Sequence, residues 1–140
     1  MREFKFRAWD KKLNIMWDPF SLTKLLEYLT FENCPNATAY EAMKDHFNDF
    51  VWQQYTGLKD KAGKDIYEGD IVTDLCYGDL VYRNSKGVVM FKDGQYIENY
   101  WNQPVADSIQ NNGRLKSCLS VIGNIYENPE MIKTGGNEND

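Results

Sequence analysis

Hydrophobic and polar residues alternate at the start of the chain. In "REFKFRAW", residues 2–9, one face of an extended chain would carry Phe4, Phe6 and Ala8, and the opposite face would carry Lys5, Arg7 and Trp9. A period of two is typical of a half-buried strand. The polar turn "DKKLN" at 10–14 and the following "IMW" predict a return strand. We therefore expect an N-terminal β-hairpin.

The period then changes. Four leucines between residues 22 and 29 recur at helical spacing behind Ser21, which can cap the first free N–H groups, so they predict a short helix. Pro35 interrupts it, and "TAYE" at Thr38 has the form of a capping box for a second helix. The stretch "DFVWQQY" at 49–55 fits either the end of that helix or an extended strand.

After Tyr55 the pattern is β, with glycine-bearing turns between short apolar runs. The expected strands are "DIVTDLCY" at 70–77, "GVVMFK" at 87–92, "QYIENYW" at 95–101 and "LSVIGNIY" at 119–126. Asp93-Gly94 lies between two of them and predicts a two-residue hairpin turn of the primed type. Short strands joined in this way favour a small SH3-like β-barrel.

The stretch "YTGLKDKAGKDIYEGDIV" at 55–72 raises the question of a catalytic loop, because it packs glycines among charged residues. Glycine also permits the positive φ of a sharp corner, so we expect this stretch to be the entry to the barrel. The expected structural residues are Gly57, Gly63, Gly69, Asp70, Asp93, Gly94 and Gly123.

These patterns predict a mainly β protein with one or two short helices. We expect residues 1–53 to form the hairpin and a short helical region. Residues 54–131 should form the barrel-like region and share the same core, because 140 residues suit one main core. The polar stretch 132–140 should be a mobile tail.

Composition narrows the candidate functions. Sixteen Lys and Arg against 21 Asp and Glu give a net charge of −5, which argues against phosphate-driven nucleic-acid binding. The one basic cluster holds Arg2, Lys5, Arg7, Lys11 and Lys12, and solvated strand and turn charges explain it equally well. Three scattered cysteines, no leader segment and no apolar run of about 20 residues favour a soluble, reduced protein of the cytoplasm, away from membranes.

Candidate catalytic residues are few. Glu68 and Asp70, with Asp60 and Asp65 nearby, could bind magnesium or perform acid–base chemistry, but they could equally accept hydrogen bonds from turn amides around Gly69. Neither a second carboxylate motif nor a phosphate-binding glycine loop accompanies them, which favours the structural role. The single histidine, His46, and the cysteines Cys34, Cys76 and Cys118 lack paired ligand spacing. We expect no catalytic residue, no metal and no cofactor.

Aromatic residues exceed what a small barrel core needs. They include Trp9, Trp17, Trp52, Tyr77, Tyr82, Tyr96, Tyr100 and Trp101. Core packing can absorb most of them. The alternative is an exposed recognition patch formed by Tyr96, Tyr100 and Trp101, which is the candidate binding site.

Four segments in order resemble the YopX family of phage and prophage proteins. They are "KFRAWD" at 5–10, "QYTGLKDKAGKDIYEGDIV" at 54–72, "GVVMFKDGQY" at 87–96 and "VIGNIYENPEM" at 121–131. The resemblance implies a β-rich protein with a barrel-like C-terminal part, encoded by a mobile element and acting inside a bacterial cell. It implies no molecular activity and no catalytic residues.

Three functions follow in order of preference. The first is a non-enzymatic binding or adaptor module that contacts a host or phage protein, with homo-oligomerisation as a further possibility. The second is a single-strand nucleic-acid-binding protein that uses a barrel face. The third is an enzyme with a carboxylate-bound metal at Glu68 and Asp70.

Overall fold

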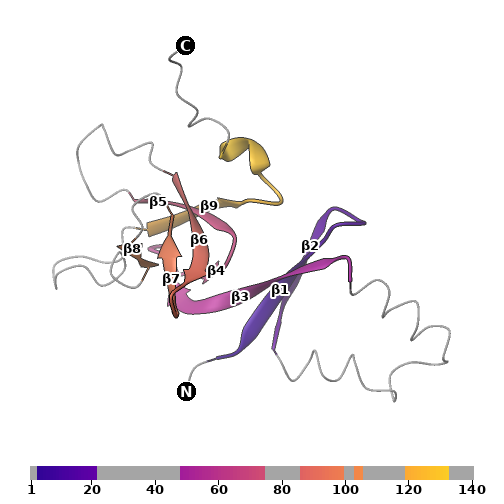
Figure 1. Ribbon diagram of the computed structural model, residues 1–140, viewed down its shortest axis with the longest axis horizontal. Helices are drawn as coiled ribbons and strands as arrows, with labels where there is room; N and C mark the ends of the chain where they lie inside the picture. Colours follow the sequence, from indigo (N-terminus) through magenta and orange to yellow (C-terminus); the bar gives the residue numbers. More distant parts are fainter. Residues whose placement is uncertain (1–2, 22–47, 75–85, 100–102, 106–118, 133–140) are drawn as a thin grey trace, which may run out of the picture. The chain divides into compact units, whose positions relative to one another are not determined.

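A computed structural model describes residues 3–21, 48–74, 86–99, 103–105 and 119–132 (Figure 1). Its strands are β1 (Lys5–Asp10), β2 (Ile15–Ser21), β3 (Phe50–Lys59), β4 (Asp65–Tyr67), β5 (Asp70–Asp74), β6 (Lys86–Lys92), β7 (Gln95–Glu98), β8 (Gln103–Pro104) and β9 (Leu119–Asn124), followed by the 3-10 helix η3 (Pro129–Met131). The chain forms two compact units, Met1–Tyr55 and Thr56–Asp140. The division falls inside β3, and the domain ranges expected above stay a prediction.

The first unit is built on the N-terminal hairpin. Strand β1 pairs antiparallel with β2 on one side and with β3 on the other. Ala8 lies opposite both Trp17 and Trp52, so these three residues share one face. The predicted hairpin is confirmed, and "DFVWQQY" is a strand. The helices predicted within residues 22–47 lie outside the described residues.

The second unit holds an antiparallel sheet in the order β8-β7-β6-β5-β9, which curls into a half-barrel (Figure 1). Its hydrophobic core consists of Ile66, Val72, Val89, Tyr96, Val105 and Leu119. Each such side chain contributes about 1.5–3 kcal/mol when it is fully buried. The expected mainly β fold with a barrel-like C-terminal part is therefore confirmed.

The hairpin turn between β6 and β7 has the predicted geometry. Asp93 and Gly94 have φ values of 51° and 81°. Two consecutive positive φ angles define a primed turn of type I′, whose twist matches that of the flanking strands. The turn brings Phe91 opposite Tyr96, with ring centroids 5.1 Å apart. Within the described ranges, no helix is long and apolar enough to cross a membrane.

Candidate functional site

The loop "DKAGK" is organised by the buried carboxylate of Asp60, which is 7% exposed. Its Oδ1 accepts hydrogen bonds from the backbone N–H groups of Ala62 at 2.8 Å and Lys64 at 2.9 Å. Its Oδ2 accepts a third, from the N–H of Val121 in β9, at 3.0 Å. Burial by itself raises the pKa of Asp60, but the three backbone donors and the Lys64 charge outweigh it and hold that pKa below its ordinary value.

The "EGD" corner is held in a similar way. Asp70 is fully buried, and its Oδ2 accepts the Tyr67 N–H at 2.8 Å. Gly69 has φ of +83°; its N–H donates to the Val89 carbonyl, and its own carbonyl accepts the Ile125 N–H. The Asn124 amide lies 3.4 Å from Asp70 Oδ1. The Asp70 carboxylate therefore accepts hydrogen bonds that stabilise this corner, which is the structural role weighed above against metal binding.

Metal chemistry finds no support from the described carboxylates. No group of three or more His, Cys, Asp or Glu side chains gathers there in a way that could hold an ion. The sequence candidates His46, Cys34, Cys76 and Cys118 lie outside the described residues.

The remaining predicted glycines also occupy structural positions. Gly57 and Gly63 have φ values of +85° and +83°. Gly123 is packed instead, because a Cβ there would lie 2.8 Å from Asn128 Oδ1 and 2.9 Å from Met131 Sδ. Six of the seven residues expected to be structural therefore lie at turns, corners or close contacts, and Gly57 lies within β3 with a positive φ.

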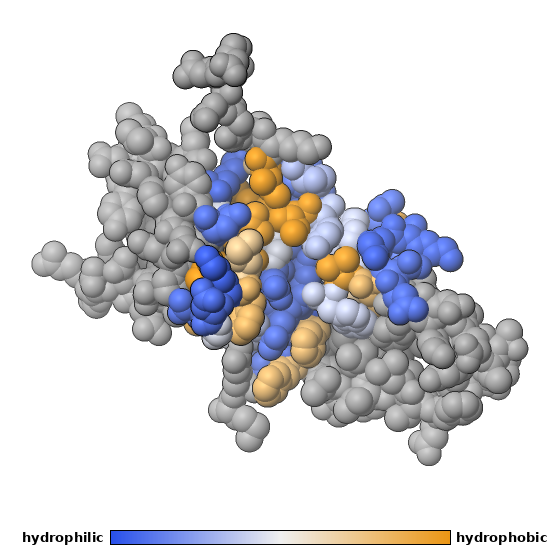
Figure 2. Space-filling view, viewed as in Figure 1, coloured by the Kyte–Doolittle hydropathy of each residue, from blue (hydrophilic) through white to orange (hydrophobic). Residues whose placement is uncertain are grey.

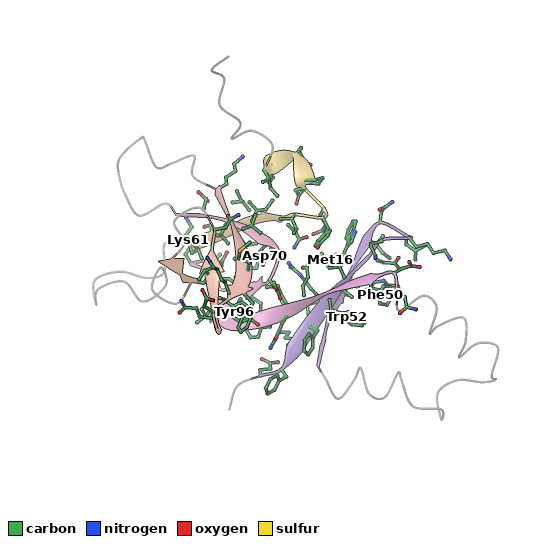
Figure 3. All side chains as sticks on the ribbon, in the orientation of Figure 1. Met16, Phe50, Trp52, Lys61, Asp70 and Tyr96 are labelled. Atoms are coloured by element: carbon green, nitrogen blue, oxygen red, sulfur yellow. The ribbon has the colours of Figure 1, made fainter. Side chains whose placement is uncertain are left out.

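The predicted aromatic patch is not supported at Tyr96. This residue is only 8% exposed and belongs to the core of the second unit (Figure 3). An exposed recognition surface cannot use a ring that core neighbours cover, so for Tyr96 the structure favours core packing. Tyr100 and Trp101 lie outside the described residues.

A different apolar surface stands out on the N-terminal hairpin. We call Leu13, Ile15 and Trp17 the hairpin patch; these side chains are 54%, 43% and 44% exposed. Leu13 lies in the turn between β1 and β2, and Ile15 and Trp17 share one face of β2. Apolar residues reach the surface next to hydrophilic ones in the described part of the molecule (Figure 2).

Aromatic neighbours extend the face behind the patch. The Trp17 ring lies 6.5 Å from that of Phe50, which in turn lies edge-on to Trp52 at 5.6 Å. Figure 3 shows Phe50 and Trp52 along β3. Tilted and edge-to-face pairs of this kind restrict the rings, so the exposed indole rests on a fixed support.

The Asp10 carboxylate fixes the conformation of the hairpin patch through hydrogen bonds. It is fully buried, and its Oδ1 accepts the N–H groups of Lys12 and Leu13, both at 2.9 Å. Its Oδ2 accepts the Trp17 indole N–H at 3.3 Å. One carboxylate therefore fixes both the turn and the orientation of the largest patch side chain.

One member of the basic cluster near the N-terminus, Arg7, is buried and not available to phosphate. Arg7 is 8% exposed, and its Nε donates to Gln53 Oε1 at 2.7 Å. The Lys5 ammonium lies 5.4 Å from the centre of the Tyr55 ring. In the described part of the cluster, Lys5 is half-buried, and Lys11 and Lys12 are the exposed cations.

Sequence reasoning missed the hairpin patch because alternation predicts strands but not which face stays open. The apolar run "IMW" immediately after a charged turn was the available signal. An isolated run of this kind is equally typical of a core strand, so the sequence could not separate the two.

The fold and its structural corners define a small β protein of two units. The YopX protein family model matches residues 5–133, and the chain belongs to this family. The crystal structure of protein EF1440 from Enterococcus faecalis is similar, with a TM-score of 0.58 and 22% identity, covering 92% of this chain and 97% of that chain. That likeness shows the fold alone. A search of curated proteins finds no significant match.

Proposed function

We propose that this YopX-family chain is a non-enzymatic binding module that contacts another protein through its N-terminal hairpin, as part of a phage or prophage function in the bacterial cytoplasm. The observation that carries the proposal is the hairpin patch. Three large apolar side chains on one supported turn and strand are each more than 40% exposed. Burying such surface against a partner is favourable at about 25 cal/mol per Å².

The chemistry of the patch suits a protein partner. Tryptophan is over-represented among the residues that dominate binding energies, particularly where its neighbours hold it rigid. Trp17 is such a tryptophan and is held rigid, because Asp10 accepts its N–H and Phe50 packs beside its ring. Little side-chain entropy remains to be lost when a partner covers it.

The two competing functions receive less support. Asp60 and Asp70, from the carboxylate group that suggested an enzyme, accept hydrogen bonds within the fold: Asp60 from three backbone N–H groups, and Asp70 from the Tyr67 N–H and the Asn124 side-chain amide. Arg7, from the one basic cluster that could have met phosphate, is buried against Gln53. A protein-binding function requires neither these carboxylates nor this arginine.

Site-specific crosslinking tests the proposal. A photoreactive phenylalanine analogue placed at Leu13, 54% exposed, is compared with the same analogue at Phe91, 53% exposed in the second unit. We expect a protein from the host or phage lysate to crosslink from position 13 but not from position 91, and to do so after nuclease treatment. Absence of a protein product at position 13, or a nuclease-sensitive product, would overturn the proposal.

A further inference from the structure

The hairpin patch lies on a sheet edge. Strand β2 is the terminal strand of the order β2-β1-β3-β4, and in the described part of the chain it pairs with β1 alone. An edge strand presents backbone N–H and C=O groups that a further strand can pair with.

Only one half of β2 carries the features that usually block such pairing. Proteins protect sheet edges with proline, irregular register or charge. The second half of β2 contains Pro19 and the register shift that follows Trp17. The first half, Ile15–Trp17, contains neither and carries no charged side chain. Among the described residues, no strand pairs with the outer edge of this short apolar stretch.

Charge at the two ends of this stretch differs in sign. Lys11 and Lys12 are exposed in the turn before Ile15, whereas the exposed Asp18 follows Trp17. Asp10 is buried and the neighbouring Asp49 is half-buried, so among the described residues the two lysines are the exposed charges at that end. A ligand with an acidic group at the turn end and none at the Asp18 end would match this arrangement.

We infer that the edge at Ile15–Trp17 binds an extended, acidic segment of the partner protein as an added antiparallel strand. The inference rests on the function proposed above and specifies its partner. Backbone hydrogen bonds supply affinity, while alternate apolar side chains of the segment pack on Ile15 and Trp17. Because the added strand runs opposite to β2, its acidic residues follow its apolar ones and reach Lys11 and Lys12.

Peptide titration of the ¹⁵N-labelled chain of 140 residues tests the inference. The probe is a peptide of about eight residues, with alternating valine and threonine followed by glutamate and aspartate, long enough to span a short strand. We expect amide shifts at Ile15–Trp17 and at the Trp17 indole. A peptide with lysines in place of the acids should bind at least about threefold more weakly at low salt, the difference expected for exposed ion pairs.

Two matched variants control for nonspecific apolar binding. Ile15→Lys places a charge on the open edge, whereas Ile132→Lys makes the same change at a side chain of equal exposure in the second unit, 44% against 43%. Binding should be lost in the first variant and kept in the second. Equal binding by both variants, or no preference for the acidic peptide, would refute strand addition.

The outcomes also separate this inference from the proposed function. If position 13 crosslinks a protein while the acidic peptide does not bind, the binding module stands and strand addition is wrong. If the Ile15–Trp17 amides of the free protein already resist hydrogen exchange and no peptide binds, the edge is covered by this chain or a second copy. That result also overturns the inference. The oligomeric state, measured by analytical ultracentrifugation, then shows whether this chain or a second copy covers the edge.

Discussion

Asp60 offers the sharpest test of how the β4 and β9 region is held together. The substitution Asp60→Asn keeps the shape of the side chain but replaces one carboxylate oxygen with an NH₂ group. If that group faces the Val121 N–H, two donors meet and one hydrogen bond is lost, at a cost of about 1–3 kcal/mol. The bonds from Ala62 and Lys64 also lose their charge assistance. Together these changes predict a loss of about 2–4 kcal/mol.

Urea unfolding at pH 7 measures this loss, and thermal unfolding should show a fall in Tm of roughly 4 °C per kcal/mol. Asp65→Asn, at the first residue of β4 directly after this loop, is the matched control. It removes the ion pair between Asp65 and Lys59, whose side chains are 18% and 60% exposed. Because the Lys59 ammonium is exposed to solvent, the pair is worth no more than about 1 kcal/mol, and this control should lose less stability than Asp60→Asn.

Acid provides an independent check on the same carboxylate. Because the folded pKa of Asp60 lies below its unfolded value, its stabilisation is complete above the unfolded pKa of about 4 and is lost as the pH falls through the folded pKa. The gap in unfolding free energy between the parent and Asp60→Asn should therefore narrow below about pH 4. A variant as stable as the parent at pH 7, with the same acid slope, would refute the reasoning.

Three further predictions concern the corners and turns. Gly123→Ala should cost about 1–3 kcal/mol in urea unfolding, because its Cβ would push on Asn128 and Met131; an unchanged midpoint would show that both can move aside. Gly94→Ala should cost about 1–2 kcal/mol through backbone strain alone, since nothing lies within 4 Å of the added carbon, and Gly94→Asn should recover part of that loss. Magnesium should leave the Tm of the parent and of Asp70→Asn equally unchanged, whereas stabilisation of the parent alone would revive the metal-enzyme hypothesis.

Local patterns predicted the strands well because strand alternation and turn chemistry act over a few residues. Asp93 and Gly94 are residue types that adopt positive φ angles readily, which is enough to predict a hairpin turn, and both have positive φ in the structure. The architectural role of Gly69 and Asp70 was also predictable, because a glycine followed by a short acidic side chain suits a tight corner. The same local logic could not decide between strand and helix at Phe50–Tyr55, since that choice depends on pairing with β1.

The candidate site depended on contacts that connect distant residues. Tyr96 looked available in the sequence, but β6 and the surrounding core bury it. Arg7 looked like part of a basic cluster, but Gln53, 46 residues away, accepts its hydrogen bond. Exposure is a property of the packed structure, so no pattern in neighbouring residues could supply it.

The sequence by itself determined the β character, the turn positions and the family resemblance of this chain, because alternation, glycine and short acidic residues act through local backbone geometry. Only the tertiary structure decided what each charged or aromatic residue does. It brought the Asp60 carboxylate to strand β9, where the N–H of Val121, 61 residues away in sequence, donates to it at 3.0 Å. It also left Ile15 and Trp17 exposed, because β2 ends its sheet and has β1 as its described neighbour.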